Sequence, residues 1–193
     1  KVGPFAYKDI FALKNKERKH PKLSLKINGP DELKYADKEK VSRLYLPYDL
    51  NLEEVKGIEV EEKYLWIPSI LTRADYKLLE QNLKLYEEIF DGVCVNNPGS
   101  FYFFKEKTGL KLHCGQFFNI VNTFSAQMLM EKGAESFTFS IEANIRDMES
   151  MVKHTSLKSE IVAHEYVQLM VMKNCPMSVL SNCKNLRDCE KCT

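Results

Sequence analysis

Short apolar runs alternate along this chain with segments of helical periodicity. In residues 23–27 apolar and polar side chains take turns, which is typical of a strand with two different faces. Residues 64–67 form a similar run that ends at Pro68, which cannot donate to a strand ladder. The predicted strands span residues 23–27, 43–46, 64–67, 92–96, 110–114, 136–140 and 161–163, and residues 169–172 form an eighth strand or extend the seventh.

The clearest helix is predicted over residues 73–90. Its apolar residues Leu79, Leu83, Tyr86 and Phe90 recur at helical spacing and therefore share one face. Further helices are predicted after the turn at residues 28–32, over residues 125–131 with an end near Gly133, and over residues 147–153.

Strands separated by crossover segments indicate parallel βαβ units. Seven or eight such units predict an α/β fold, namely a TIM-type (β/α) barrel or a partial barrel with parallel strands. A doubly wound open sheet is the alternative, but neither a Gly-x-Gly-x-x-Gly motif nor a Walker loop is present. We expect residues 1–21 to be a linker or N-terminal extension, residues 22–174 to form the barrel domain, and residues 175–193 to be a cysteine-rich segment.

The composition is that of an ordinary globular protein, with 44% hydrophobic and 28% charged residues. A formal net charge of +1 gives no electrostatic argument for nucleic-acid binding. No apolar stretch approaches the roughly 20 residues that cross a bilayer, and no signal peptide is evident. We therefore expect a cytoplasmic protein without a membrane partner. The start at Lys1-Val2-Gly3-Pro4 leads us to expect that a longer parent chain supplies the remainder.

Polar residues follow several of the predicted strands, where parallel α/β folds place their chemistry. We expect Glu142 and His113 to be catalytic, although Glu142 could instead cap a helix and His113 could be a packing residue. Since His164 and Glu165 are adjacent, a strand would point them to opposite faces, and only one would enter a pocket. The predicted substrate-binding residues are Asn96, Asn119, Asn122, His164 and Glu165.

Four of the six cysteines lie close to the C-terminus, at Cys175, Cys183, Cys189 and Cys192. Four thiolates suit zinc or an iron–sulfur cluster, and the spacing does not separate the two. Disulfides and free thiols are the alternatives. Cys94 lies between two valines and is predicted to be a buried thiol, whereas the role of Cys114 stays open.

Residues 160–178 resemble the signature of the collagenase-like peptidase family, peptidase family U32. The matching positions are Glu160, Ile161, His164, Val167 and the segment Cys175-Pro176-Met177-Ser178, and weaker likeness extends over residues 22–193. Three positions depart from the signature, because Glu165 and Lys173 replace glycines and Gln168 replaces a cysteine. Only Cys175 carries over directly as a ligand position.

The resemblance implies a TIM-barrel-like fold and a peptidase acting on a peptide or protein substrate. Other members of the family are iron–sulfur proteins that hydroxylate RNA bases or a quinone precursor. A hydroxylase acting on RNA or a small aromatic is therefore one alternative, and a non-catalytic barrel fragment of a larger protein is another. No Ser–His–Asp triad, Cys–His pair or His-Glu-x-x-His motif in the sequence explains peptide hydrolysis.

Overall fold

The computed structural model of the protein describes residues 21–35, 39–168, 170 and 171. The chain divides into two units, residues 1–162 and residues 163–193. All helices and strands of the described residues belong to the first unit. The four C-terminal cysteines and the predicted boundary after residue 174 lie outside the described residues.

Strands and helices alternate through the first unit. The strands are β1 (Leu23–Lys26), β2 (Val41–Pro47), β3 (Glu62–Trp66), β4 (Gly92–Val95), β5 (Lys111–Cys114), β6 (Ser136–Thr138) and β7 (Lys158–Glu160). The helices are α2 (Leu52–Lys56), α3 (Arg73–Ile89), α4 (Pro98–Lys107), α5 (Thr123–Glu131) and α6 (Ile145–His154), with short 3-10 helices η1 (Pro30–Tyr35) and η2 (Gln116–Phe118). None of the helices in the described part of the chain has both the length and the apolar character that a bilayer crossing requires.

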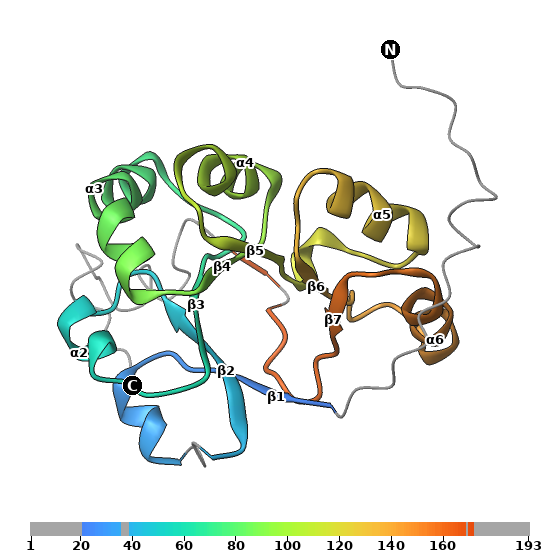
Figure 1. Ribbon diagram of the computed structural model, residues 1–193, viewed down its shortest axis with the longest axis horizontal. Coiled ribbons are helices and arrows are strands. Elements are labelled where there is room, and N and C mark those ends of the chain that lie inside the picture. Colours follow the sequence, from blue (N-terminus) through green and yellow to red (C-terminus); the bar gives the residue numbers. More distant parts are fainter. Residues whose placement is uncertain (1–20, 36–38, 169, 172–193) are drawn as a thin grey trace, which may run out of the picture. The chain divides into compact units, whose positions relative to one another are not determined.

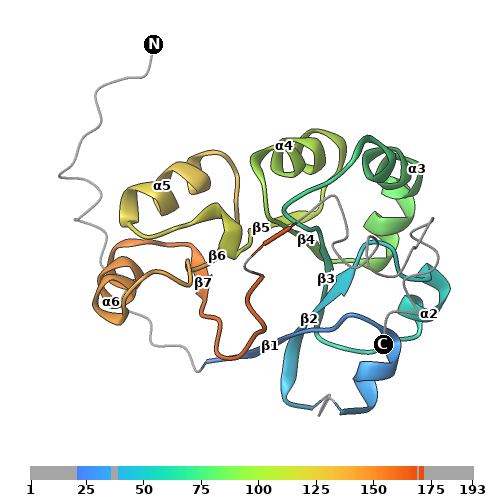
Figure 2. The same ribbon diagram turned by 180° about the vertical axis from the view of Figure 1, so that it is seen from behind.

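The seven strands form one parallel sheet in the order β1 to β7. Figure 1 shows this sheet curling so that helices α3 to α6 lie along its outer side, and the reverse view in Figure 2 shows the same arrangement. The fold is therefore a partial TIM-like barrel, as the sequence predicts, with β1 and β7 as the edge strands of the described sheet.

The outer face of the sheet is apolar. Leu46, Leu65, Val93 and Leu112 are in register across four neighbouring strands, and all are buried in the main hydrophobic core. The buried helix residues Leu79, Tyr86 and Phe104 belong to the same core. Burial of these apolar side chains between sheet and helices is the main stabilising contribution to the fold.

The inner face of the sheet is mostly polar or aromatic. Arg43 is in register with Glu62, Cys94 with His113, and Thr138 with Glu160. In a typical TIM barrel this face carries layers of branched apolar side chains. Here the strands place charged side chains inside, and these side chains need hydrogen-bond or ion-pair partners within the barrel.

Asparagine and threonine side chains begin the principal helices. Thr72 and Asp75 form a capping box at the start of α3, and Asn97, Asn122 and Asn144 cap α4, α5 and α6. Each cap accepts a hydrogen bond from a backbone N–H that has no partner within the helix. Helix capping thus accounts for Asn97 after β4 and for Asn122 after β5.

The seventh strand is the clearest correction to the prediction. It spans Lys158–Glu160, whereas the apolar run at residues 161–163 lies beyond it and begins with an exposed Ile161. The residues of β7 are polar and pair with β6 along the backbone. The Glu160 side chain points to the polar inner face, where it binds Arg43. Helix α4 and the short helix α2 were not predicted. The predicted strand at residues 169–172 includes Leu169 and Met172, which are not described.

Gly92 is required by a close approach inside the barrel. A Cβ at this position would lie 2.4 Å from the Tyr64 ring and 2.7 Å from the Lys111 carbonyl oxygen. We expect Gly92→Ala to lower the free energy of unfolding by roughly 1–3 kcal/mol through overpacking, measured by urea denaturation. Gly57→Ala is the control, since its Cβ would meet nothing closer than 3.7 Å. Equal effects of the two substitutions would contradict this packing argument.

Candidate functional site

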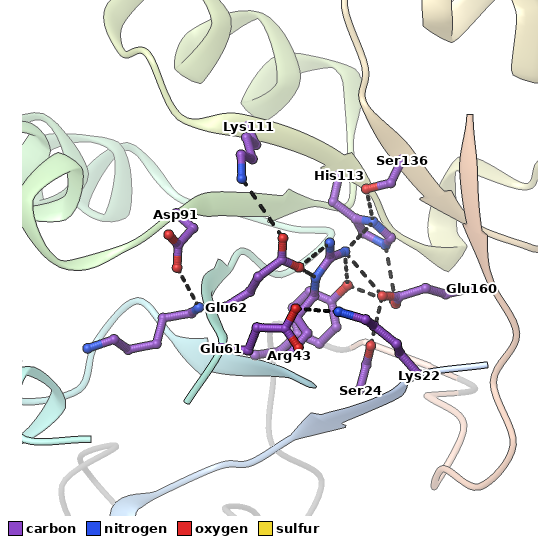
Figure 3. A network of polar contacts seen from close by, with 12 residues as sticks. Lys22, Ser24, Arg43, Glu61, Glu62, Asp91, Lys111, His113, Ser136 and Glu160 are labelled. Atoms are coloured by element: carbon purple, nitrogen blue, oxygen red, sulfur yellow. Dashed lines mark hydrogen bonds and ion pairs between the residues drawn. The ribbon is translucent and has the colours of Figure 1, made fainter. Parts of the chain in front are cut away.

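Arg43 of β2 forms the centre of a polar cluster inside the barrel (Figure 3). Its Nη2 and Nε donate to Glu62 Oε2 at 2.7 and 2.9 Å. Its Nη1 donates to Glu160 Oε1 at 3.1 Å. The Arg43 side chain is only 8% exposed, so a buried guanidinium lies between two carboxylates. We call Arg43 and its partners Ser24, Tyr45, Glu62, His113, Ser136, Thr138 and Glu160 the lumen cluster.

Glu160 joins strands that the sheet leaves unpaired. It is the last residue of the edge strand β7, and its carboxylate accepts hydrogen bonds from Ser24 Oγ of β1 and from the Tyr45 hydroxyl of β2, both at 2.8 Å. With the bond from Arg43, the Glu160 carboxylate thus has three donors from two strands across the barrel. These side-chain contacts connect the two edges of the described sheet.

His113 of β5 is completely buried beside this carboxylate. Its Nδ1 lies 3.5 Å from Arg43 Nη1 and 2.8 Å from Ser136 Oγ, and its Nε2 lies 2.8 Å from Thr138 Oγ1. A guanidinium can only donate, so Nδ1 is the acceptor and these partners assign the ring proton to Nε2.

The electrostatics agree with a neutral His113. Burial lowers the pKa of His113 to about 4, and the Glu160 carboxylate, 3.7 Å from Nε2, acts in the opposite direction without offsetting it. Burial alone would raise the pKa of the Glu62 carboxyl, but the hydrogen bonds and charge of Arg43 hold this pKa below its usual range. The lumen cluster therefore holds a charged arginine, an ionised Glu62 and a neutral imidazole at pH 7.

Aromatic rings enclose the cluster. The Arg43 guanidinium carbon lies 4.0 Å from the centre of the Tyr64 ring, a cation–π arrangement. The Tyr45 ring makes an edge contact with Tyr64 at 5.8 Å between centres, and it lies 5.6 Å from His113. Burial raises the pKa of Tyr45, so its hydroxyl keeps the proton that it donates to Glu160.

A second polar region lies in the loops that follow β5 and β6. The Ser140 N–H donates to the Ile120 carbonyl oxygen at 3.2 Å, which joins the two loops. The Ser140 hydroxyl accepts from the Glu142 N–H at 3.2 Å. In the β5 loop Asn119 has a left-handed backbone with φ of 51°. Asparagine adopts this conformation more readily than other non-glycine residues, and Asn119 ends the short helix η2 in this way.

The joined loops also expose apolar side chains. Val121 and Ile141 are adjacent in sequence to the two residues of the Ile120–Ser140 bond, and both are exposed. Ile145, at the start of α6, is 63% exposed. We call residues 119–122 and 140–145 the rim loops. They present amides, one carboxylate and aliphatic side chains at the carboxyl ends of β5 and β6.

Comparison with known families decides the assignment. The model of peptidase family U32 matches residues 61–193, which is more than half of the sequence. The chain belongs to peptidase family U32. Glu160 of the lumen cluster is the glutamate with which the U32 signature-like segment begins.

Two solved structures resemble the U32 chain in fold. One is the U32 peptidase Mk0906, with a TM-score of 0.56 and 13% identity, over 76% of this chain and 71% of that chain. The other is a Streptococcus agalactiae protein named for copper homeostasis, CutC, with a TM-score of 0.55 and 16% identity, over 72% of this chain and 84% of that chain. At these identities both support the fold alone. Among proteins with curated descriptions, none matches the sequence.

The predicted site residues of the U32 chain fall into separate places. Asn119, Asn122 and Glu142 lie in the rim loops, which the Ser140–Ile120 bond joins, and Asn122 also caps α5. His113 lies in the lumen cluster, and no hydrogen bond or ion pair connects it to Glu142 within the described residues. Asn96 is buried and donates to the Ile67 carbonyl oxygen at 2.7 Å. This bond gives Asn96 a structural role, and its role in substrate binding stays a prediction.

The remaining predicted residues belong to the second unit or are not described. His164 is exposed, and its ring lies 6.3 Å from that of Tyr166. Glu165 is half-buried. The proposed metal ligands Cys175, Cys183, Cys189 and Cys192 lie outside the described residues, and the residues that are described contain no cluster of His, Cys, Asp or Glu suited to a metal ion. Cys94 is a buried thiol, as predicted, and Cys114 is buried as well.

Sequence reasoning missed most of the lumen cluster. Arg43 and Tyr45 were assigned to a strand without a role, and Glu62 was not singled out. One signal in the sequence points to Arg43 and Tyr45. They alternate with Leu44 and Leu46, so one face of this strand is polar and the other is apolar.

Proposed function

We propose that this U32 chain hydrolyses peptide bonds in a peptide or protein substrate that binds at the rim loops. The observation that carries the proposal is the Ser140–Ile120 backbone bond, which joins the loop that carries Asn119 and Asn122 to the loop that carries Glu142. Family membership supports the choice of substrate class.

The rim loops offer the contacts that a peptide needs. The exposed Val121, Ile141 and Ile145 can cover apolar side chains of a substrate. Asn122 uses its Oδ1 to cap α5, which leaves its Nδ2 as a donor to a substrate carbonyl. Asn119 presents its side chain from a left-handed turn in the same loop.

Glu142 is the proposed general base. Its carboxylate is exposed in the loop after β6, and its backbone N–H is fixed by Ser140. The carboxylate would take a proton from the attacking water while the water oxygen bonds to the scissile carbonyl carbon. The same proton then passes to the departing amine as the carbon–nitrogen bond breaks.

A serine–histidine mechanism fits the structure less well. Ser136 Oγ lies 2.8 Å from His113 Nδ1, but Ser136 is 2% exposed and His113 is 0% exposed. A polypeptide substrate cannot reach a hydroxyl at this depth in the described unit. The proposal therefore places the chemistry at the rim loops, and contact of His113 with substrate has no support from its position.

Glu142→Gln tests the proposal directly. We expect this substitution to reduce kcat on gelatin or a fluorogenic peptide by at least roughly 100-fold, because the amide cannot accept the proton. Glu149→Gln, an exposed position on α6, is the matched control and should keep wild-type activity. Equal activity of the two variants, or no hydrolysis by the wild-type protein, would count against the assignment.

Membership of the U32 family supports a second candidate, an iron–sulfur hydroxylase acting on RNA or a small aromatic, for which the four C-terminal cysteines would be the cluster ligands. Iron and sulfide analysis of anaerobically purified protein separates the two candidates. Stoichiometric iron and sulfide with a broad visible absorbance would favour the hydroxylase. Zinc or bare thiols together with peptide turnover would favour the peptidase.

A further inference from the structure

We propose that the lumen cluster positions the rim loop that carries Glu142, with His113 and Glu160 as its positioning residues. The catalytic consequence rests on the proposed function, but the mechanical claim can be tested without it. The proposal comes from three sets of contacts that lead from the barrel interior to residue 142.

The first set is centred on Glu160. Its carboxylate is fixed from inside the barrel by Arg43, Tyr45 and Ser24. Its main-chain carbonyl oxygen accepts from the Phe139 N–H at 2.9 Å. The same residue therefore connects the lumen cluster to the first residue after β6.

The second set acts on the residue before Phe139. His113 Nε2–H donates to Thr138 Oγ1 at 2.8 Å, and Thr138 is the last residue of β6. Thr138 is also in register with Glu160. The end of β6 is thus held both by a side-chain bond from β5 and by its pairing with β7.

The third set continues from Phe139 to Glu142. Phe139 is buried and packs against Phe137 with 5.0 Å between ring centres. Ser140 is buried as well, donates its N–H to Ile120 and accepts the Glu142 N–H on its hydroxyl. Every residue from Thr138 to Ser140 is thereby held by a hydrogen bond, and Glu142 is bonded directly to the last of them.

Directional bonds explain why this interior is polar. An apolar barrel interior is packed by contacts that depend weakly on orientation. Hydrogen bonds fix both distance and angle, so they define the end of β6 more narrowly than packing alone. A charged cluster that is fully paired can therefore hold a catalytic loop in one geometry.

Glu160→Gln tests the inference. The substitution preserves the shape of the side chain but removes its negative charge. The amide NH2 can only donate, so it cannot replace a carboxylate oxygen that accepts from Arg43, Tyr45 or Ser24. We expect amide hydrogen exchange at Phe139, Ser140 and Glu142 to become roughly tenfold faster or more, because the end of β6 opens locally. If the proposed function holds, kcat on the peptide substrate should fall while KM changes little. Glu61→Gln, at an exposed pair with Lys22, is the matched control and should change neither measurement.

The outcomes separate the two proposals. Faster exchange in Glu160→Gln without peptide turnover by any variant would support the positioning role and contradict the proposed function. Unchanged exchange in a folded Glu160→Gln protein would overturn the positioning role, whatever the activity. If Glu160→Gln does not fold, Thr138→Val replaces it, since this substitution removes only the acceptor for His113. Exchange at Phe139 and Ser140 should then accelerate, and unchanged exchange would overturn the inference.

Discussion

Arg43→Met is expected to lower the free energy of unfolding by about 3–5 kcal/mol, because it removes the principal cation from two partly buried carboxylates. Both Glu62 and Glu160 bind the guanidinium. Without it Glu62 would keep Lys111, at 3.9 Å, and Glu160 would keep its two hydroxyl donors. The two glutamate side chains are 24% and 23% exposed, so water can reach them in part and the lower end of this range is expected. Urea unfolding at pH 7 measures the difference.

Lys22→Met is the control for Arg43→Met. It removes a cation that also pairs with a glutamate, but both side chains of the Lys22–Glu61 pair are more than half exposed. Surface pairs of this kind contribute roughly 0–1 kcal/mol. A triple variant that combines Arg43→Met with Glu62→Gln and Glu160→Gln should recover part of the lost stability. Equal effects of Arg43→Met and Lys22→Met would show that the cluster does not depend on its arginine.

The second large expected effect is that the free energy of unfolding falls in acid because of His113. Its pKa is about 4 in the folded protein and near 6.5 in an unfolded chain, so the unfolded state binds more protons between these values. Stability from this residue is present above about pH 6.5 and is lost as the pH falls toward 4. Between pH 7 and pH 4 the loss amounts to about 3 kcal/mol.

The measurement is the difference between the unfolding free energies at pH 7 and pH 4. Carboxylates such as Glu62 add their own loss in acid, so the wild-type protein must be compared with a variant. In His113→Gln this difference should shrink by about 3 kcal/mol, even if the variant is less stable at pH 7. His164→Gln, at an exposed position, should leave the difference unchanged. An unchanged difference in His113→Gln would contradict a buried neutral imidazole.

The sheet could be predicted because its outer face depends on local patterns. The run at residues 92–96 and the helix at residues 73–90 each carry the apolar side chains that the core needs. Strand β7 was misplaced for the opposite reason. Its residues Lys158–Glu160 are polar and pair through the backbone, so hydrophobic periodicity pointed instead to the next apolar run.

The candidate site was harder to predict because its members are far apart in sequence. Arg43 and Glu160 are separated by 117 positions, and Arg43 and His113 by 70. No local pattern predicts such pairs. They follow only once the strand register and the curvature of the sheet are known. The rim loops were closer to prediction, since Asn119, Asn122 and Glu142 all follow strands, yet the Ser140–Ile120 bond that joins them could not be deduced.

The central claim is that the barrel interior is one paired cluster around a neutral His113 with its proton on Nε2. Nitrogen-15 NMR of the His113 ring between pH 6 and pH 8 tests it most directly. The His113 signals should stay constant over this range, with Nδ1 unprotonated and an Nε2–H that exchanges slowly with water. A His113 ring that titrates near pH 6.5, or that carries its proton on Nδ1, would contradict it.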